Sequence, residues 1–190
     1  MRAIVGFVHA VDRLNEAVGR AAAWLTLVTV IVCAVVVVLR YAFSIGFVWM
    51  QELYVWAYAC VFMLGAGYTL LHEGHVRVDI FYAEASARTR AIVNLFGAFV
   101  FLLPWLALTA WTSIPYVRAS WRLGEGSAQS FGMPAVYLLK SVLLVFCLLL
   151  GLQGLALAGR SILTLTGRDE PDVVLSEAAG EDESTPTGAI

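Results

Sequence analysis

Two groups of polar side chains flank one long apolar stretch, and their residue types could bind ions, protons or metals. Glu52 directly precedes a run of nineteen uncharged residues, Leu53–Leu71, and the segment 72–79 (HEGHVRVD) directly follows that run. A carboxylate at membrane depth can form an ion or proton site, tie its helix to a partner helix, or pair with Arg40 or a backbone donor. For Glu52 the structural roles are favoured over ion coupling.

The two histidines of the segment 72–79 stand three residues apart. His72 and His75 could therefore share a helix face and bind a metal together with a carboxylate. However, HEGH lacks the spacing of the HExxH zinc motif, and Gly74 weakens a helix at this point. A structural role is favoured, in which the segment ends the apolar run and Asp79 caps the following helix or pairs with Arg77.

No other pattern of side chains in the sequence indicates catalysis. The chain has no nucleophile–base pair, no phosphate-binding loop and no basic nucleic-acid patch. All three histidines lie outside the long apolar runs, which argues against an axial haem pair. We therefore predict that the chain is not an enzyme, that it holds no cofactor or metal, and that it binds no nucleic acid.

The elements that must position these groups are membrane-spanning helices. Of the 190 residues, 61% are apolar and only 14% are charged, whereas globular chains carry about 25% charged residues. The mean hydropathy is +0.82. A helix of nineteen residues is roughly 28 Å long, about one hydrocarbon thickness. The sequence predicts an all-α integral membrane protein with four transmembrane helices, over Ala21–Leu39, Leu53–Leu71, Ala91–Ser113 and Ala135–Ala158.

Two further helices are expected at the membrane interface. Residues 2–20 carry Ile4, Phe7, Val11, Leu14 and Val18 at helical spacing, which predicts an amphipathic helix before the chain turns into the bilayer. Residues 80–90 show a similar mixture of apolar and charged side chains. Pro104 is expected to kink the third span, and residues 114–134 are expected to connect it to the fourth.

Charge predicts the orientation and the domain boundary. With the N-terminus inside, eight Lys or Arg residues lie on the cytoplasmic side and four on the outer side, which favours cytoplasmic termini. Residues 1–167 then form the membrane domain. Residues 168–190 carry one Arg and seven acidic residues with Pro, Ser, Thr and Gly, and are expected to form a disordered acidic cytoplasmic tail.

Several short motifs, in a fixed order along the four predicted spans, resemble a known family. LNEAVGR and RYAF flank the first span, WMQEL and HEGHVRVD flank the second, and GEGSAQSFGMPAVYLLK leads into the fourth, which contains Leu-Gln-Gly. Over residues 10–160 the chain is similar to the small membrane subunit, of DctQ type, of tripartite ATP-independent periplasmic (TRAP) transporters.

The resemblance implies a small permease subunit in a bacterial inner membrane. It implies that a large sodium-coupled membrane subunit carries the substrate, that a periplasmic binding protein captures it, and that the substrate is an organic acid or similar small solute. The small subunit would act as a scaffold among membrane lipids and help to dock the binding protein. Candidate partner contacts are Trp49 and Glu52 at the outer interface, His75 and Asp79 at the inner corner, and Arg118, Trp121, Arg122 and Glu125 on the outer side.

Two alternatives belong to other functional classes. A self-contained homo-oligomeric exporter or channel would be favoured by a charged residue deep inside a span, and the sequence shows none there. A membrane enzyme or redox protein would be favoured by a haem or metal in the purified chain. The transporter subunit is therefore the preferred hypothesis.

Overall fold

The fold consists of long helices that lie in a row and do not form a closed bundle. A computed structural model describes residues 2–74 and 85–167. Helices α1 (Arg2–Ala42), α2 (Val48–Leu71) and α6 (Val136–Leu165) are each continuous. A further helical stretch consists of α4 (Ala87–Phe96), the π-helical turn η1 (Gly97–Leu102) and α5 (Leu103–Leu123). These four stretches are long and apolar enough to cross a membrane, which confirms the predicted fold class.

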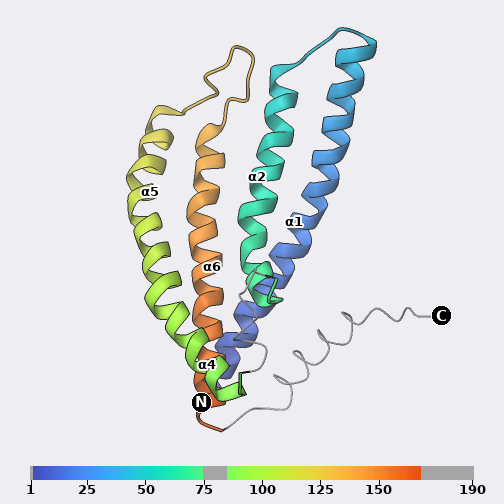
Figure 1. Cartoon of the computed structure of the whole chain (residues 1–190). Coiled ribbons are helices and arrows are strands. Elements are labelled where there is room, and N and C mark those ends of the chain that lie inside the picture. Colours follow the sequence, from blue (N-terminus) through green and yellow to red (C-terminus); the bar gives the residue numbers. More distant parts are fainter. Residues whose placement is uncertain (1, 75–84, 168–190) are drawn as a thin grey trace, which may run out of the picture.

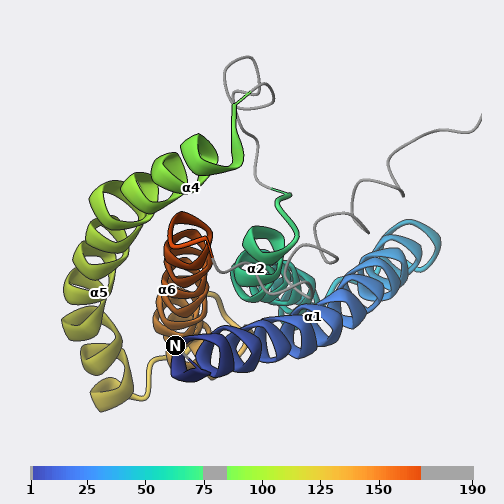
Figure 2. The same cartoon turned by 90° about the horizontal axis from the view of Figure 1, so that it is seen from below.

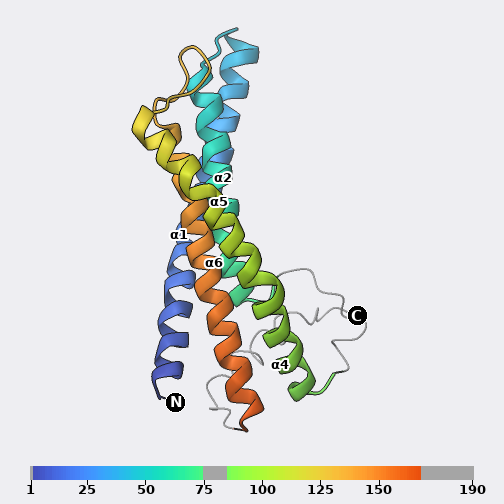
Figure 3. The ribbon, with the colours of Figure 1, turned by 90° about the vertical axis from the view of Figure 1, so that its left-hand side faces the viewer.

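Helix α6 is the centre of the row. Figure 1 shows the order α5, α6, α2, α1. The views from below and from the side (Figures 2 and 3) show that α4 and α5 curve around α6 and that α1 runs obliquely past α2 toward α6. Helix α6 packs against α4, η1 and α5 on one side and against α2 on the other, and it also contacts α1. It is the most buried of the four, whereas α1 and α2 have most of their apolar surface exposed.

Two apolar clusters hold the neighbours of α6 in place. Val8 and Val11 of α1 pack against Ala156, which is completely buried. The second cluster joins Leu106 of α5 to Cys147 and Leu150 of α6, with α2 side chains at its edge. Lipid is as apolar as these side chains, so no hydrophobic effect drives the helices together. Close packing of small residues stabilises their association instead.

The N-terminal helix does not turn before it enters the first span. Helix α1 runs without a break through residues 2–20 and 21–39, so the predicted turn between them is absent, whereas the interfacial position of residues 2–20 stays a prediction. Of the apolar side chains on which the amphipathic prediction rests, Phe7 and Leu14 are exposed and Val11 is buried. Val8, Val11, Asn15, Gly19 and Ala22 are buried at spacings of three and four residues. Helix α1 packs against both α2 and α6.

The third helical stretch continues further than its apolar run. The prediction of a connection over residues 114–134 is wrong for its first part, because α5 ends only at Leu123. Buried Val117 and Ser120 extend the packed face beyond the predicted span. The helix ends where Gly124 adopts a left-handed conformation (φ 56°), and Glu125 N–H donates to the Ser120 carbonyl at 3.1 Å in a Schellman arrangement.

The helix register changes just before Pro104, where the sequence predicts a kink. Leu103 N–H donates to the Ala98 carbonyl, five residues back, at the end of the π-helical turn. Pro104 then stands in the first turn of α5, where its missing N–H costs least. A second proline, Pro115, lies inside α5. Figure 1 shows the curved path of α4 and α5 around α6.

Part of the predicted mid-chain interfacial helix lies outside the described residues. Residues 80–84 and the tail 168–190 are among those that the structure does not describe. Residues 87–90 form the first turn of α4, which is continuous with the third span. Ser86 caps this helix by accepting a hydrogen bond from Thr89 N–H at 3.3 Å.

Candidate partner-contact sites at the two ends of the helices

The polar side chains gather at the two ends of the row. At one end lie the α1–α2 connection and the α5–α6 connection, and we call this the Glu52 end. At the other lie the start of α1, the end of α2, the start of α4 and the end of α6, and we call this the His72 end (Figures 1 and 3). Both ends join helices that are distant in the sequence.

Glu52 fastens the α5–α6 connection to the first turns of α2. Its carboxylate accepts hydrogen bonds from the Ser127 hydroxyl and, at 2.6 Å, from Met133 N–H. Ser127 N–H also donates to the Met133 carbonyl at 2.9 Å, which closes the connection between these two residues. Of the roles left open by the sequence, this geometry corresponds to pairing with a backbone donor.

Gly132 has no side chain, which leaves room for the Glu52 carboxylate beside it. A Cβ at this position would overlap the Ser127 hydroxyl and lie 2.8 Å from Glu52 Oε1. The glycine in the motif Gly132-Met133-Pro134 is therefore explained by the close approach of the connection to α2.

A second pair of charges lies on the α5–α6 side of the Glu52 end. Lys140 Nζ lies 2.5 Å from Glu125 Oε2 and 4.1 Å from the centroid of the Tyr116 ring. Hydrogen bonding to Lys140 lowers the pKa of Glu125 below its ordinary value. The carboxylate therefore keeps its charge at neutral pH, and the pair would be lost only as the pH falls through that lowered pKa.

The remaining candidates at the Glu52 end differ in exposure. Trp121 donates its indole N–H to the Ser141 hydroxyl at 2.8 Å, and its ring lies 4.7 Å from that of Tyr137. Arg118 and Arg122, one turn apart on α5, are exposed and make no ion pair within residues 2–74 and 85–167. Trp49 is 45% exposed. The two arginines and Trp49 are thus exposed to a partner, whereas Trp121 and Glu125 also make contacts within the chain.

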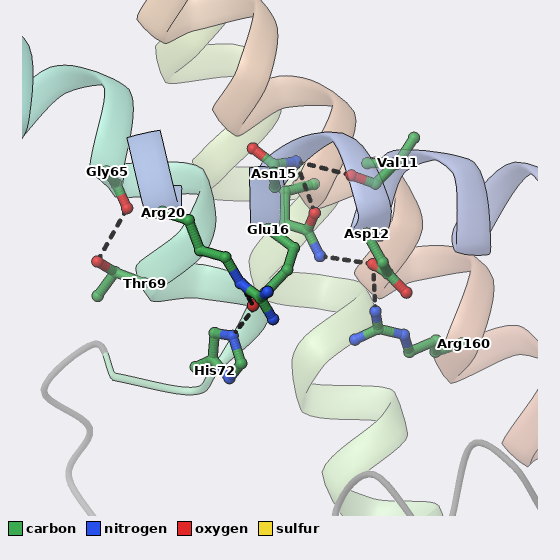
Figure 4. Close-up of polar contacts among 10 residues, drawn as sticks. Val11, Asp12, Asn15, Glu16, Arg20, Gly65, Thr69, His72 and Arg160 are labelled. Carbon is green, nitrogen blue, oxygen red and sulfur yellow. Dashed lines mark hydrogen bonds and ion pairs between the residues drawn. The ribbon is translucent and has the colours of Figure 1, made fainter. Parts of the chain in front are cut away.

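At the His72 end, a buried polar network joins α1 to α6 (Figure 4). Asn15 Nδ2 donates to Gln153 Oε1 at 2.8 Å, and Gln153 Nε2 donates to Asp12 Oδ1 at 3.1 Å. Arg160 lies 2.5 Å from the same Asp12 oxygen. Asn15 and Gln153 are among the largest fully buried side chains, at 0% and 1% exposure.

The same asparagine brings α1 close to α2. A Cβ at Gly67 would overlap Asn15 Oδ1, and a Cβ at Gly19 would overlap the Tyr68 ring. No donor in the described part of the chain forms a hydrogen bond with Asn15 Oδ1, which lies against the glycine. The two glycines therefore allow the backbones of α1 and α2 to cross closely.

His72 also pairs with α1. Its Nε2 lies 2.8 Å from Glu16 Oε2, its ring lies 4.3 Å from that of Tyr68, and Arg20 pairs with the other Glu16 oxygen at 2.8 Å. The structure thus ties the end of the second span to the N-terminal helix. His75 and Asp79 lie outside the described residues, and their predicted corner role stays a prediction. Among the described residues, no three His, Cys, Asp or Glu side chains group as metal ligands.

Sequence reasoning did not identify four residues of the His72 end: Asp12, Asn15, Gln153 and Arg160. A usable signal exists for Asn15, because it stands at helical spacing between Val8, Val11 and Ala22 on one face. Gln153 is a polar residue within the predicted fourth span, about 10 Å from the level of Arg160 along the helix. A buried amide of this kind needs a partner.

Comparison with known families identifies the chain. Residues 28–164 match the family described as tripartite ATP-independent periplasmic transporters, DctQ component. The match covers most of the chain, so the protein belongs to this family. No curated protein and no solved structure matches the chain in the corresponding comparisons.

The motifs of the sequence resemblance meet at the two ends of the row. LNEAVGR contributes Asn15, Glu16 and Gly19, and Leu-Gln-Gly contributes Gln153, all at the His72 end. WMQEL and the sequence before the fourth span contribute the contacts of Glu52 with Ser127 and Met133. These motifs thus mark contacts between helices.

The buried amide pair predicts a measurable coupling between α1 and α6. Asn15→Ala and Gln153→Ala should each destabilise the protein, and the double variant should lose less than the sum of the two. We expect a coupling free energy of about 0.6 to 1.7 kcal/mol, the range for side-chain hydrogen bonds between membrane helices. A double-mutant cycle of unfolding in detergent measures it. The control is Thr29→Ala, which removes a hydroxyl that bonds within α1 only. Its effect on the free energy of unfolding should add fully to that of Gln153→Ala. Full additivity between Asn15→Ala and Gln153→Ala would contradict the network.

Glu52→Gln should loosen the α5–α6 connection. Ser127 and Met133 donate to different oxygens of the carboxylate, and the carboxamide replaces one of these oxygens with an NH2 group, which cannot accept a hydrogen bond, and also removes the negative charge. We expect faster amide hydrogen exchange at Met133, and the same direction of change for Gly132→Ala. Glu125→Gln is the matched control and should leave the Met133 amide unchanged. Equal protection in the wild type and Glu52→Gln would show that the carboxylate does not hold the connection.

Proposed function

We propose that this member of the DctQ component family is the small permease subunit of a TRAP transporter in a bacterial inner membrane. In this role it scaffolds a large sodium-coupled membrane subunit and helps a periplasmic binding protein to dock, for uptake of an organic acid or similar small solute. The family match carries this proposal. The chain itself transports nothing and catalyses nothing.

The shape of the row supports a scaffold role. Large apolar side chains are exposed on all four helical stretches, among them Trp24 (71%), Phe62 (70%), Trp111 (78%) and Leu148 (60%). A row with apolar side chains exposed on each of its helices can pack beside a larger membrane protein and still contact lipid. It thereby widens the membrane footprint of that partner.

The polar network also supports a scaffold over a transport path. Two ion pairs lie at the His72 end, Arg160 with Asp12 and Arg20 with Glu16. The Asp12–Arg160 pair joins α1 to α6, and Glu16 also pairs with His72 at the end of α2, so neither carboxylate is free to act as an ion site. The Glu52 carboxylate is likewise occupied by Ser127 and Met133.

The Glu52 end is the proposed side for docking. With both termini in the cytoplasm, as the Lys and Arg distribution indicates, this end faces the periplasm. Arg118 and Arg122 are exposed there, and the connection beside them is fixed by Glu52. A fixed cationic surface can steer an acidic partner at long range.

Affinity purification in mild detergent tests the proposed partners. The full chain, isolated from its native membranes, should carry a stoichiometric large polytopic membrane protein that mass spectrometry identifies. A pure homo-oligomer without such a partner would overturn the proposal and favour a self-contained exporter or channel.

Reversing the two arginines should slow docking of the binding protein. Arg118→Glu together with Arg122→Glu should lower the association rate constant about tenfold or more at low salt, because rim charges act mainly on the encounter. The difference should shrink as ionic strength rises. Surface plasmon resonance on the purified membrane complex measures the rate. The control is Arg88→Glu, which reverses an exposed cation at the His72 end. If the double variant associates as fast as the wild type, docking at this surface is excluded.

A further inference from the structure

Helix α1 is too long to lie entirely within the hydrocarbon core of a membrane. The helix has 41 residues, about 60 Å, whereas the hydrocarbon core is about 30 Å thick. Figure 2 shows the helix running obliquely across the end of α2 toward α6. Roughly half of α1 therefore lies outside the hydrocarbon or along its boundary.

The N-terminal half of α1 has three faces. The first packs against α2 and α6 through Val8, Val11 and Asn15. The second is exposed and cationic, since Arg2, Arg13 and Arg20 are eleven and seven residues apart and fall on one line along the helix. The third is exposed and apolar, with residues spaced by three and four: Ala3, Phe7, Ala10, Leu14, Ala17 and Ala21.

The exposed apolar face continues into the membrane-spanning half. The same spacing extends from Ala21 to Trp24, Val28 and Ile31, which are 71%, 40% and 53% exposed. Phe7 and Leu14 are 41% and 43% exposed on the same line. Lipid that covers Trp24 and Ile31 in the span can therefore also cover Phe7 and Leu14 without a break.

The exposed arginines beside the apolar face favour a negatively charged partner. Arg13 is exposed and has no ion-pair partner within the described residues, and the side chain of Arg20 is 76% exposed although it pairs with Glu16. By helical geometry the cationic line lies about 100° around the helix from the apolar line. Cations on the flank of an apolar stripe reach the phosphate level when the stripe enters the acyl boundary.

We propose that the N-terminal half of α1 is a docking surface for anionic phospholipids. Phe7 and Leu14 enter the acyl boundary, and Arg2 and Arg13 contact the headgroup phosphates. The proposal is independent of the transporter partners, because it uses only exposed side chains of α1 and the continuity of that helix with its span.

The test compares lipid retention by the full chain. The protein is placed in nanodiscs with equal amounts of phosphatidylglycerol and phosphatidylcholine, and native mass spectrometry counts the lipids that remain bound. The wild type should retain phosphatidylglycerol preferentially. Arg2→Gln with Arg13→Gln should reduce that preference roughly tenfold or more, at about fivefold for each arginine near an anionic surface. Arg118→Gln with Arg122→Gln removes two exposed arginines at the Glu52 end and is the matched control, with no change expected.

Three results would overturn the proposal. One is equal retention of both lipids by the wild type. Another is an equal loss of preference in the control variant. The third concerns residues 168–190, whose excess of acidic residues could also occupy the cationic face. If a chain ending at Gly167 retains phosphatidylglycerol and the full chain does not, the acidic segment occupies this face in the intact protein.

Discussion

The hydrogen bonds of Gln153 with α1 are the interaction on which the arrangement of the helices depends. Gln153 is almost fully buried in the central helix, and its amide reaches Asn15 with one end and Asp12 with the other. An apolar contact could slide along a helix in lipid, whereas a buried amide must meet its partners at one register. Asn15 in turn lies against Gly67, so the same residue sets the crossing of α1 and α2. Three of the four helical stretches are thereby fixed relative to one another at the His72 end, and Glu52 fixes the α5–α6 connection at the other end.

A row fixed at both ends suits a protein that supports others. The described helices bury few of their large apolar side chains outside α6, and two of their carboxylates, Asp12 and Glu16, form ion pairs within the chain. Transport by a rigid row would require a polar path along a span, whereas the described charges lie near the ends. These features agree with the proposed division of labour, in which the moving, ion-coupled steps belong to a larger subunit and the row supplies a stationary surface toward lipid on one side and that subunit on the other.

The fold could be predicted from the sequence as far as it depends on local hydrophobicity. Lengths of apolar runs gave the number and approximate position of the spans. The packed face of α1 could not be chosen in this way, because Phe7 and Leu14 form an apolar stripe as regular as Val8 and Ala22, and only the neighbouring helices decide between them. The partners of Glu52 and of Gln153 are separated from them by 75 or more positions, which no local pattern reveals. Likewise, α5 extends past its apolar run because Val117 and Ser120 pack against the rest of the molecule.

Reconstituted uptake is the most direct measurement of the central claim that this chain is a non-transporting scaffold. Proteoliposomes would contain the chain alone, its co-purified large partner alone, or both, with the binding protein and its labelled solute outside and an inward sodium gradient. The account predicts no uptake by the chain alone and full uptake only when both membrane proteins are present. Sodium-driven uptake by the chain alone, or full uptake by the large partner without it, would contradict the account.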